Sequence, residues 1–134
     1  MAVMKHETLP IRTENDVVQT RQTVRLWASE VGFSLVAQTK IVTAASELAR
    51  NVLVHGGGGI ARLEMLQESP RRGLRVVFED QGPGIPDIEL ALRDGYTTGN
   101  GLGLGLGGSR RLVGEFEIVS RPGEGTRVTI TNWK

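Results

Sequence analysis

Two stretches of the chain repeat apolar residues at intervals of three and four positions, which is the spacing of one face of an α-helix. The first stretch runs to about Val31, and the second covers residues 35–55. The repeating positions are Val17, Thr20, Val24, Trp27, Ala28 and Val31 in the first, and Ile41, Val42, Ala45, Leu48, Ala49, Val52 and Leu53 in the second. Two amphipathic helices are therefore predicted, each with one face to bury.

Short polar residues and glycines mark the ends of these helices. Asn15 or Asp16 is expected to cap the first helix, because their side chains accept hydrogen bonds from free backbone amides. Gly32 suits the end of that helix, since glycine adopts a left-handed conformation without strain. Ser34 is expected to cap the second helix, which stops at the four consecutive glycines 56–59.

Shorter stretches alternate in polarity or are continuously apolar, as β-strands are. We expect strands over residues 60–67, 74–80, 115–120 and 126–132, and a short edge strand over residues 5–12, where Pro10 is tolerated. The remaining predicted features are turns at Pro70–Gly73 and Pro122–Gly125, one or two helical turns at Asp87–Asp94, and a helix near residues 106–113.

The order of these elements predicts the fold class. The late strands adjoin each other through tight turns and not through helices, which favours a mixed or antiparallel sheet over a doubly wound parallel one. We expect a two-layer α/β sandwich with helices on one face of the sheet. No linker or internal repeat interrupts the chain, so residues 1–134 are predicted to form one domain.

Composition excludes several classes of function. Lys and Arg total 16 against 15 Asp and Glu, and this net charge of +1 offers no strong field for nucleic acid or an anionic membrane. The absence of cysteine excludes disulfides and thiolate zinc sites, and two histidines are too few for a multi-histidine metal site. Because no apolar run approaches the ~20 residues of a membrane span and no signal peptide is recognisable, a cytoplasmic protein is expected.

Glycine is concentrated locally, since six of the 18 glycines lie between Gly99 and Gly108. Alternating glycines expose successive backbone N–H groups, and this suits an anionic ligand such as a phosphate. The stretch 103–108 matches a dinucleotide-binding fingerprint, but no apolar strand precedes it. A P-loop would need a lysine after its last glycine, where this chain has Ser109 and Arg110. We therefore predict that this loop binds an anionic ligand outside both of these phosphate-binding folds.

A polar line runs along the second predicted helix. Glu47, Asn51 and His55 are spaced by four residues, so they follow one side of the helix and border its apolar face. Such a line is also typical of an ordinary solvated flank. Asn is nevertheless a poor choice for a helix interior, and its neutral oxygen is a good ligand for a hard cation such as Mg²⁺.

Asp80 ends an apolar strand and is followed by a turn rich in glycine and proline. A carboxylate at the end of a strand is a well-fixed hydrogen-bond acceptor, and Gly82 and Gly84 would let a flat ligand approach the backbone. The same residue types also occur in turns without any ligand. Asp80 by itself is therefore compatible with a ligand-binding site and with an ordinary turn.

The order and spacing of these motifs resemble the GHKL family of ATP-binding domains, which includes gyrase, Hsp90, histidine kinases and MutL. The segments that carry the resemblance are Glu47–His55, Asp80–Pro86, Gly101–Gly107 and Gly125-Thr126. Within the family, the segments SELARN, EDQGPGIPDIE and DGYTTGNGLGLGLGGSRRL are most similar to the RsbT-type serine/threonine switch kinases of stress signalling. The resemblance implies the Bergerat fold, with ATP bound beside the helices under a flexible lid.

The resemblance also implies roles for single residues. Asn51 matches the residue that binds Mg²⁺ between the phosphates, and Glu47 matches the general base toward the attacking hydroxyl. Asp80 matches the acceptor of the adenine amino group, and Thr126 matches a residue that hydrogen-bonds near adenine. Residues that match the adenine pocket are Gly82, Gly84 and Ile85, and residues that match the phosphate lid are Gly101, Leu102, Gly103, Leu104 and Gly105.

By resemblance, the substrates of such a kinase are STAS-domain antagonist proteins, and the released kinase binds a PP2C-type phosphatase. An alternative is an anti-sigma factor, a module that sequesters a sigma factor in an ATP-dependent manner. A histidine kinase is disfavoured, because a chain of this length leaves no room for a dimerising helical pair with its phospho-acceptor. The residues themselves assign no role to Arg50, His55, Arg110 or Arg111.

Overall fold

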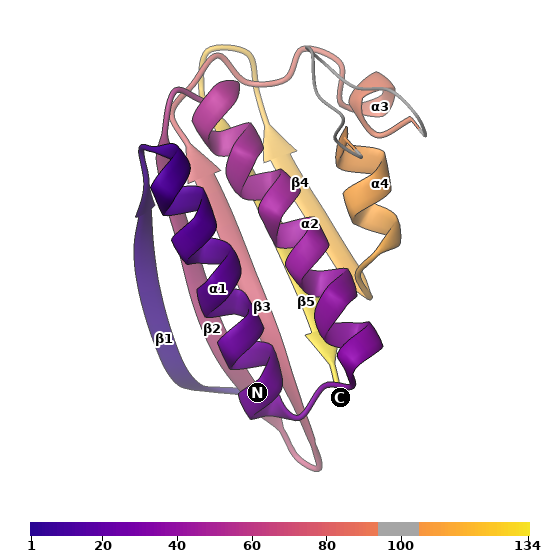
Figure 1. The fold of residues 1–134 in the computed structure, drawn as a ribbon. Coiled ribbons are helices and arrows are strands. Elements are labelled where there is room, and N and C mark those ends of the chain that lie inside the picture. Colours follow the sequence, from indigo (N-terminus) through magenta and orange to yellow (C-terminus); the bar gives the residue numbers. More distant parts are fainter. Residues whose placement is uncertain (94–104) are drawn as a thin grey trace.

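A computed structural model describes residues 1–93 and 105–134 and contains five strands and four helices within those ranges (Figure 1). The strands are β1 (Ala2–Ile11), β2 (Gly59–Glu68), β3 (Arg71–Asp80), β4 (Glu115–Ser120) and β5 (Thr126–Trp133). The helices are α1 (Glu14–Val31), α2 (Leu35–Val54), α3 (Ile88–Ala91) and α4 (Gly105–Arg111). Each expected element is present, with its ends shifted by at most a few residues.

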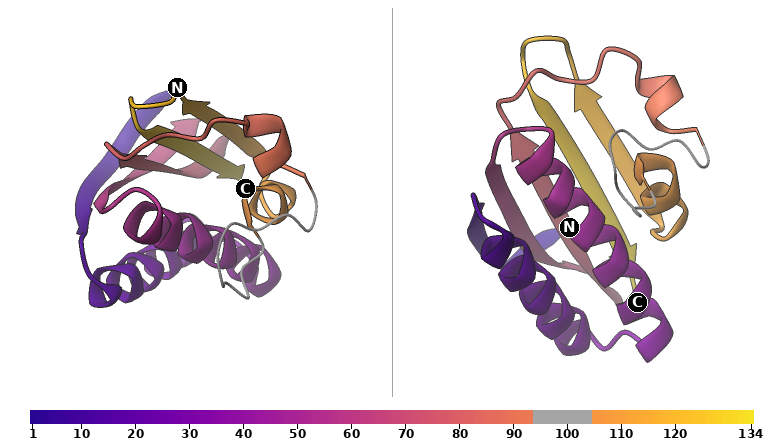
Figure 2. Two further views of the ribbon diagram at one scale, coloured as in Figure 1. Left: turned by 90° about the horizontal axis from the view of Figure 1, so that it is seen from above. Right: turned by 45° about the horizontal axis from the view of Figure 1, so that its top comes forward.

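The strands form one sheet in the order β1-β2-β3-β5-β4, and every neighbouring pair is antiparallel. Of the two arrangements expected, mixed or antiparallel, the sheet has the antiparallel one. Helices α1 and α2 cover one face of the sheet, as the view from above shows (Figure 2). The predicted two-layer α/β sandwich is therefore confirmed, and Pro10 lies in an edge strand as expected.

The core lies between this face of the sheet and the two long helices. Its buried side chains include Val24, Trp27, Ile41, Leu48, Leu63, Val76, Phe78, Val128 and Ile130. Side chains of a strand alternate between its two faces, so the residue two positions after Phe78 and the residue two positions before Val128 share the helix-covered side. Those residues are Asp80 and Thr126, which follow the core at the end of β3 and at the start of β5.

The first helix begins at a different residue from the one expected. Thr13 is its N-cap: the Thr13 hydroxyl accepts a hydrogen bond from the Asp16 N–H (3.1 Å), and the Asp16 carboxylate accepts one from the Thr13 N–H (3.2 Å). Asp16 is thus the third residue of the helix in a capping box, and the expectation of Asn15 or Asp16 as cap is wrong. Gly32 and Ser34 occupy the cap positions that were predicted for them.

The turn between β2 and β3 is shorter than Pro70–Gly73. The strands stay in register up to the pair of Glu68 with Arg71, so only Ser69 and Pro70 form the turn. Gly73 lies inside β3, where an added Cβ would come within 2.6 Å of the Trp133 ring. Glycine is therefore required at position 73 by the close approach of the Trp133 ring, and not by a bend of the chain.

The face of the sheet away from the helices carries a group of charged residues. Glu64 is 8% exposed and accepts hydrogen bonds from Arg75 (2.7 Å) and Arg62 (3.4 Å). Burial raises the pKa of Glu64, but the hydrogen bonds and charges of Arg75 and Arg62 outweigh it and hold the pKa below its ordinary value.

Within the described ranges, no helix is long and apolar enough to cross a membrane.

Candidate nucleotide site

Glu47 and Asn51 leave α2 on the same flank, because residues four apart differ by about 40° around a helix axis. Both are half-buried, beside the buried Leu48 and Val52. Among residues 1–93 and 105–134, neither side chain forms a hydrogen bond or ion pair with another residue. A carboxylate and a carboxamide are therefore available to a ligand at the edge of the core.

The end of α2 leads directly to Asp80. The N–H groups of His55 and Gly56 donate to the carbonyl oxygen of Asn51, at 2.9 and 3.1 Å, so Gly56 follows the last helical turn. An added Cβ at Gly56 would come within 2.6 Å of the Asp80 Oδ2 atom. Only glycine leaves room for the carboxylate there, and the contact joins the end of α2 to the end of β3.

Two further glycines close around Asp80. An added Cβ at Gly82 would lie 2.7 Å from the Cα of Gly56, and one at Gly125 would collide with the carbonyl oxygen of Asp80. Gly125 also has φ of +83°, a conformation that favours glycine. The Asp80 Oδ1 atom accepts a hydrogen bond from the Gly82 N–H at 2.9 Å. The carboxylate is thus held by its own loop, and its Oδ2 atom makes no hydrogen bond to the described residues.

Asp80 belongs to a row of polar residues that crosses three strands. In the register of the sheet it lies opposite Thr126, which lies opposite Ser120 of β4. Directly paired residues point to the same face, so the three side chains share the helix-covered side. The Ser120 and Thr126 hydroxyl oxygens are 2.7 Å apart.

The loop after Asp80 is tied to this row. The Ile85 N–H donates to the Ser120 hydroxyl at 2.8 Å, and the Gly123 N–H donates to the carbonyl oxygen of Pro83 at 2.7 Å. Gly84 has φ of +77°, and an added Cβ would collide with the carbonyl oxygen of Arg121. The loop that carries the predicted pocket residues Gly82, Gly84 and Ile85 is therefore held against the end of β4 and the turn between β4 and β5.

A hollow of about 310 Å³ lies at this end of the sheet. Its lining includes Asp80, Ser120, Gly125 and Thr126, together with charged residues of the adjoining loops and strands. Glu47 and Asn51 are not part of that lining, and they connect to it through the contact of Gly56 with Asp80. Glu79, Val119 and Arg127 also line the hollow, and they alternate with Asp80, Ser120 and Thr126 along their strands, so the hollow extends to the face of the sheet away from the helices. The predicted pocket residues Gly82, Gly84 and Ile85 are not part of its lining.

The glycine-rich lid falls largely outside the described ranges. Gly101, Leu102, Gly103 and Leu104 belong to the segment that the structure does not describe. Gly105 is the first residue of α4, with φ of +69°. Helix α4 packs against α2 on the side away from α1 (Figure 1).

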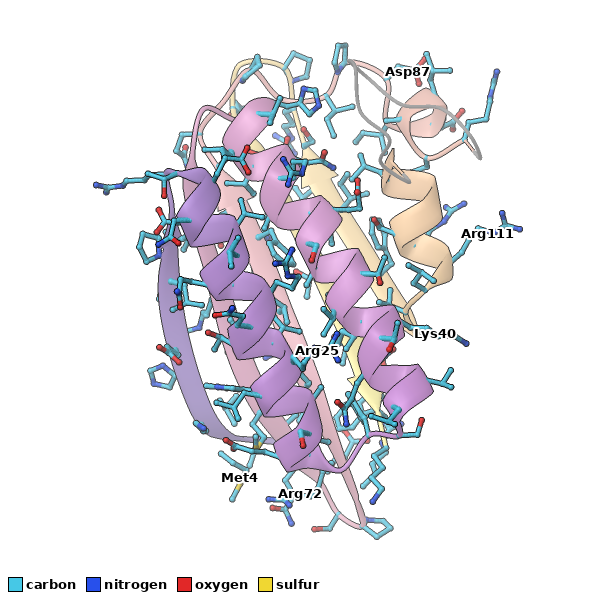
Figure 3. All side chains as sticks on the ribbon, viewed as in Figure 1. Met4, Arg25, Lys40, Arg72, Asp87 and Arg111 are labelled. Atoms are coloured by element: carbon cyan, nitrogen blue, oxygen red, sulfur yellow. The ribbon has the colours of Figure 1, made fainter. Side chains whose placement is uncertain are left out.

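The four basic residues without an assigned role lie in different parts of the structure. The Arg50 guanidinium forms an ion pair with Glu14 of α1 at 3.2 Å, so it joins the two long helices. Arg110 and Arg111 are exposed in the last turn of α4, and Arg111 extends from the outer side of that helix (Figure 3). His55 is the C-cap residue of α2.

The donor set is compatible with a magnesium–nucleotide complex and not with a metal held by protein alone. Within the described part of the chain, no three His, Asp or Glu side chains gather as a metal site. Mg²⁺ bound with a nucleotide commonly takes one or two protein ligands, and phosphates and water complete its shell. The free carboxamide of Asn51 is able to supply one such oxygen.

Sequence reasoning missed two residues of this site. The alternation of residues 115–120 predicts only a strand, although a serine at the last position of a strand, before a turn, is suited to hold neighbouring loops. Gly56 was included only in a run of four glycines that ends α2. Its specific role arises from contact with Asp80, a residue 24 positions later, and no local pattern carries that information.

Comparisons with known proteins agree with this geometry. The family model described as histidine kinase-, DNA gyrase B- and HSP90-like ATPase matches residues 36–133. The serine/threonine-protein kinase RsbT of Bacillus subtilis is 46% identical over 123 residues, which are 92% of each of the two chains. The anti-sigma F factor of a Thermoanaerobacter species is 29% identical over 84% of this chain and 82% of that protein.

Solved structures show the same fold. The RsbU and RsbW domains of a Mycobacterium tuberculosis protein match with a TM-score of 0.63 and 25% identity, over 96% of this chain and 31% of that one. The mycobacterial sensor histidine kinase MprB matches with a TM-score of 0.53 and 21% identity, over 96% of this chain and 97% of that one. The expected GHKL fold, ATP binding and the enzyme class of a serine/threonine kinase are thereby confirmed. The chain belongs to the family of histidine kinase-, DNA gyrase B- and HSP90-like ATPases.

Proposed function

We propose that this serine/threonine-protein kinase transfers the γ-phosphoryl group of ATP to STAS-domain antagonist proteins in a partner-switching system. The observation that carries the proposal is the close packing at Gly56, Gly82 and Gly125, where Gly56 leaves room for the Asp80 carboxylate beside the end of α2. The identity of 46% with a serine/threonine-protein kinase over 92% of both chains supports the same activity. The catalytic domain is taken to be the single unit of residues 1–134.

Asp80 is the residue proposed to recognise the adenine base. Its Oδ2 atom is free to accept a hydrogen bond from the adenine amino group, since Oδ1 is already bonded to the Gly82 N–H. Thr126, its partner across the strands, adds a hydroxyl on the same face. Gly82, Gly84 and Ile85 form the wall of the pocket, and the backbone amides of the lid, residues 101–105, bind the phosphates.

Asn51 is the proposed ligand of Mg²⁺, through its carboxamide oxygen. The metal, when bound with ATP, neutralises charge on the phosphates. Glu47, one helical turn earlier, accepts the proton of the attacking Ser or Thr hydroxyl. The hydroxyl oxygen forms a bond to the γ-phosphorus as the bond from that phosphorus to the β,γ-bridging oxygen breaks, which yields a phosphoprotein and ADP.

The new phosphate then acts as the switch. It carries a charge close to −2 at the surface where kinase and substrate meet, and repulsion and desolvation separate them. The released kinase binds and activates a PP2C-type phosphatase. Because ATP and these partners are found inside the cell, the cytoplasm is the compartment in which we expect the protein.

An anti-sigma factor is the second candidate, because anti-sigma F factors are 29% identical over more than four fifths of the chain. The higher identity to a kinase that is not named an anti-sigma factor favours the first candidate. A pull-down with purified sigma factors separates the two, since only an anti-sigma factor retains one in the presence of ATP.

The test of the function is transfer of label from γ-labelled ATP to purified STAS-domain proteins, with and without Mg²⁺. We expect Asn51→Ala to abolish transfer, and Glu47→Gln to bind ATP but to lose turnover by at least about a hundredfold. Arg50→Gln is the matched control on α2, because Arg50 pairs with Glu14 away from the site. Unchanged transfer by Asn51→Ala would contradict the metal role, and unchanged turnover by Glu47→Gln would contradict the base.

A further inference from the structure

Ser120 uses every hydrogen-bonding position of its hydroxyl group. The oxygen accepts from the Ile85 N–H at 2.8 Å, lies 3.1 Å from the carbonyl oxygen of Gly125, and lies 2.7 Å from the Thr126 hydroxyl. A serine hydroxyl has one proton to donate and two lone pairs that accept. These three contacts therefore saturate it.

The number of protons determines the direction of each bond. A carbonyl oxygen only accepts, so the contact with Gly125 requires the Ser120 proton. The contact between the two hydroxyls must then use the proton of Thr126. The reverse direction would leave the Gly125 carbonyl without this hydrogen bond, and polar groups of buried residues such as Gly125 are normally satisfied.

Thr126 then has no proton left for a ligand, and its hydroxyl oxygen can only accept. Asp80, opposite Thr126 across the strands, offers the free oxygen of its carboxylate on the same side. This end of the sheet thus presents, on its helix-covered side, an edge of two adjacent acceptors and no side-chain donor from this pair.

We propose that Ser120 is a positioning residue that fixes the Thr126 hydroxyl as an acceptor and so makes this edge select a purine with a 6-amino group. An amino group offers two N–H donors, whereas the 6-oxo group of a hypoxanthine or guanine base offers only an acceptor. This inference rests on the proposed nucleotide site and adds the origin of its base selectivity. Ser120 acts through Thr126 and need not contact the nucleotide.

The experiment compares the dissociation constants of Mg·ATP and Mg·ITP by calorimetry on the full chain; in ITP a 6-oxo group replaces the 6-amino group and N1 carries a hydrogen. We expect Ser120→Ala to lower the preference for ATP over ITP by about tenfold, the equivalent of about 1.4 kcal/mol. Ser120→Thr keeps the hydroxyl and is expected to retain the preference. Ser29→Ala, at an exposed position of α1, is the matched control and should bind as the wild type does.

A double-mutant cycle tests whether Ser120 acts through its neighbour. In a Thr126→Val background, Ser120→Ala should no longer change the ratio of ATP to ITP affinity. A ratio that Ser120→Ala leaves unaltered in the otherwise wild-type protein, with ATP still bound, would overturn this inference alone. An equal drop in both affinities, with the ratio preserved, would also overturn it, because it indicates a purely structural serine. A wild-type chain that binds neither nucleotide would instead overturn the proposed function.

Discussion

At Gly56, Gly82 and Gly125, the missing Cβ atom allows three segments of the chain to approach Asp80. These glycines come from the loop after α2, the loop after β3 and the turn before β5. The site is therefore shaped by backbone packing, and the carboxylate is its main side-chain group. At the scale of residues, substitutions that add volume and substitutions that change hydrogen bonding should have different consequences.

Gly56→Ala tests the added volume. The new methyl group would approach the Asp80 Oδ2 atom to 2.6 Å, so the carboxylate has to move, and we expect ATP affinity to fall at least tenfold. Gly114→Ala is the control, because its methyl group would meet the Asn132 Oδ1 atom at 3.2 Å, away from the hollow. Titration of both variants with ATP measures the difference. Equal affinities would show that the position of Asp80 is not critical.

Asp80→Asn tests the chemistry of the acceptor. The amide oxygen can still accept from the Gly82 N–H, so the fold is retained, but the second oxygen becomes an N–H₂ donor. A donor facing the adenine amino group should weaken ATP binding by about a hundredfold, as expected for loss of a charge-assisted hydrogen bond. Calorimetric titration with ATP, and a melting curve as the folding control, measure this. Wild-type affinity in the variant would exclude Asp80 from base recognition.

At the scale of elements, periodicity and turn residues predicted the helices and strands well, because each pattern is local. The errors arose where a distant contact decides the outcome. Gly73 was assigned to a turn, but it makes room for Trp133 of β5. The cap of α1 is Thr13, because the capping box pairs it with Asp16, whereas propensity alone does not separate these neighbouring polar residues.

Thr13→Ala should destabilise the protein by about 1 kcal/mol, since it removes the acceptor for a free N–H of α1. Thr23→Ala is the matched control, because the Thr23 hydroxyl only donates to the carbonyl oxygen of Gln19 within the same helix. Urea unfolding of both variants measures the free energy of unfolding. A loss for Thr23→Ala as large as that for Thr13→Ala would contradict the role of the cap.

The buried Glu64 makes stability depend on acid pH. Its pKa is lowered in the folded protein, so its contribution is present at neutral pH and is lost as pH falls through the ordinary value, 4.5, toward the folded one. Glu64→Gln should cost about 1–2 kcal/mol at pH 7 and progressively less below pH 4.5. Glu68→Gln, which breaks an exposed pair with Arg71, should cost less than about 1 kcal/mol. Urea unfolding at several pH values measures both; a pH-independent cost for Glu64→Gln would be inconsistent with this pair.

At the scale of the whole molecule, the motifs identified the family because their order along the chain reflects how the fold assembles them. The end of α2 lies beside the end of β3 because Gly56, whose N–H donates to the Asn51 carbonyl oxygen, is in contact with Asp80. The motifs predict which residues carry the chemistry, and these assignments stay predictions until a nucleotide complex is determined. They did not predict Ser120, whose role depends on the register between β4 and β5.

The most direct test of this account is a crystal structure of the protein with Mg²⁺ and a non-hydrolysable ATP analogue. We expect the adenine amino group within hydrogen-bond distance of the Asp80 carboxylate, the metal on the Asn51 carboxamide oxygen, and the γ-phosphate within reach of Glu47. A nucleotide bound elsewhere on the sheet, or one whose base turns away from Asp80 while its phosphates lie far from α2, would contradict it.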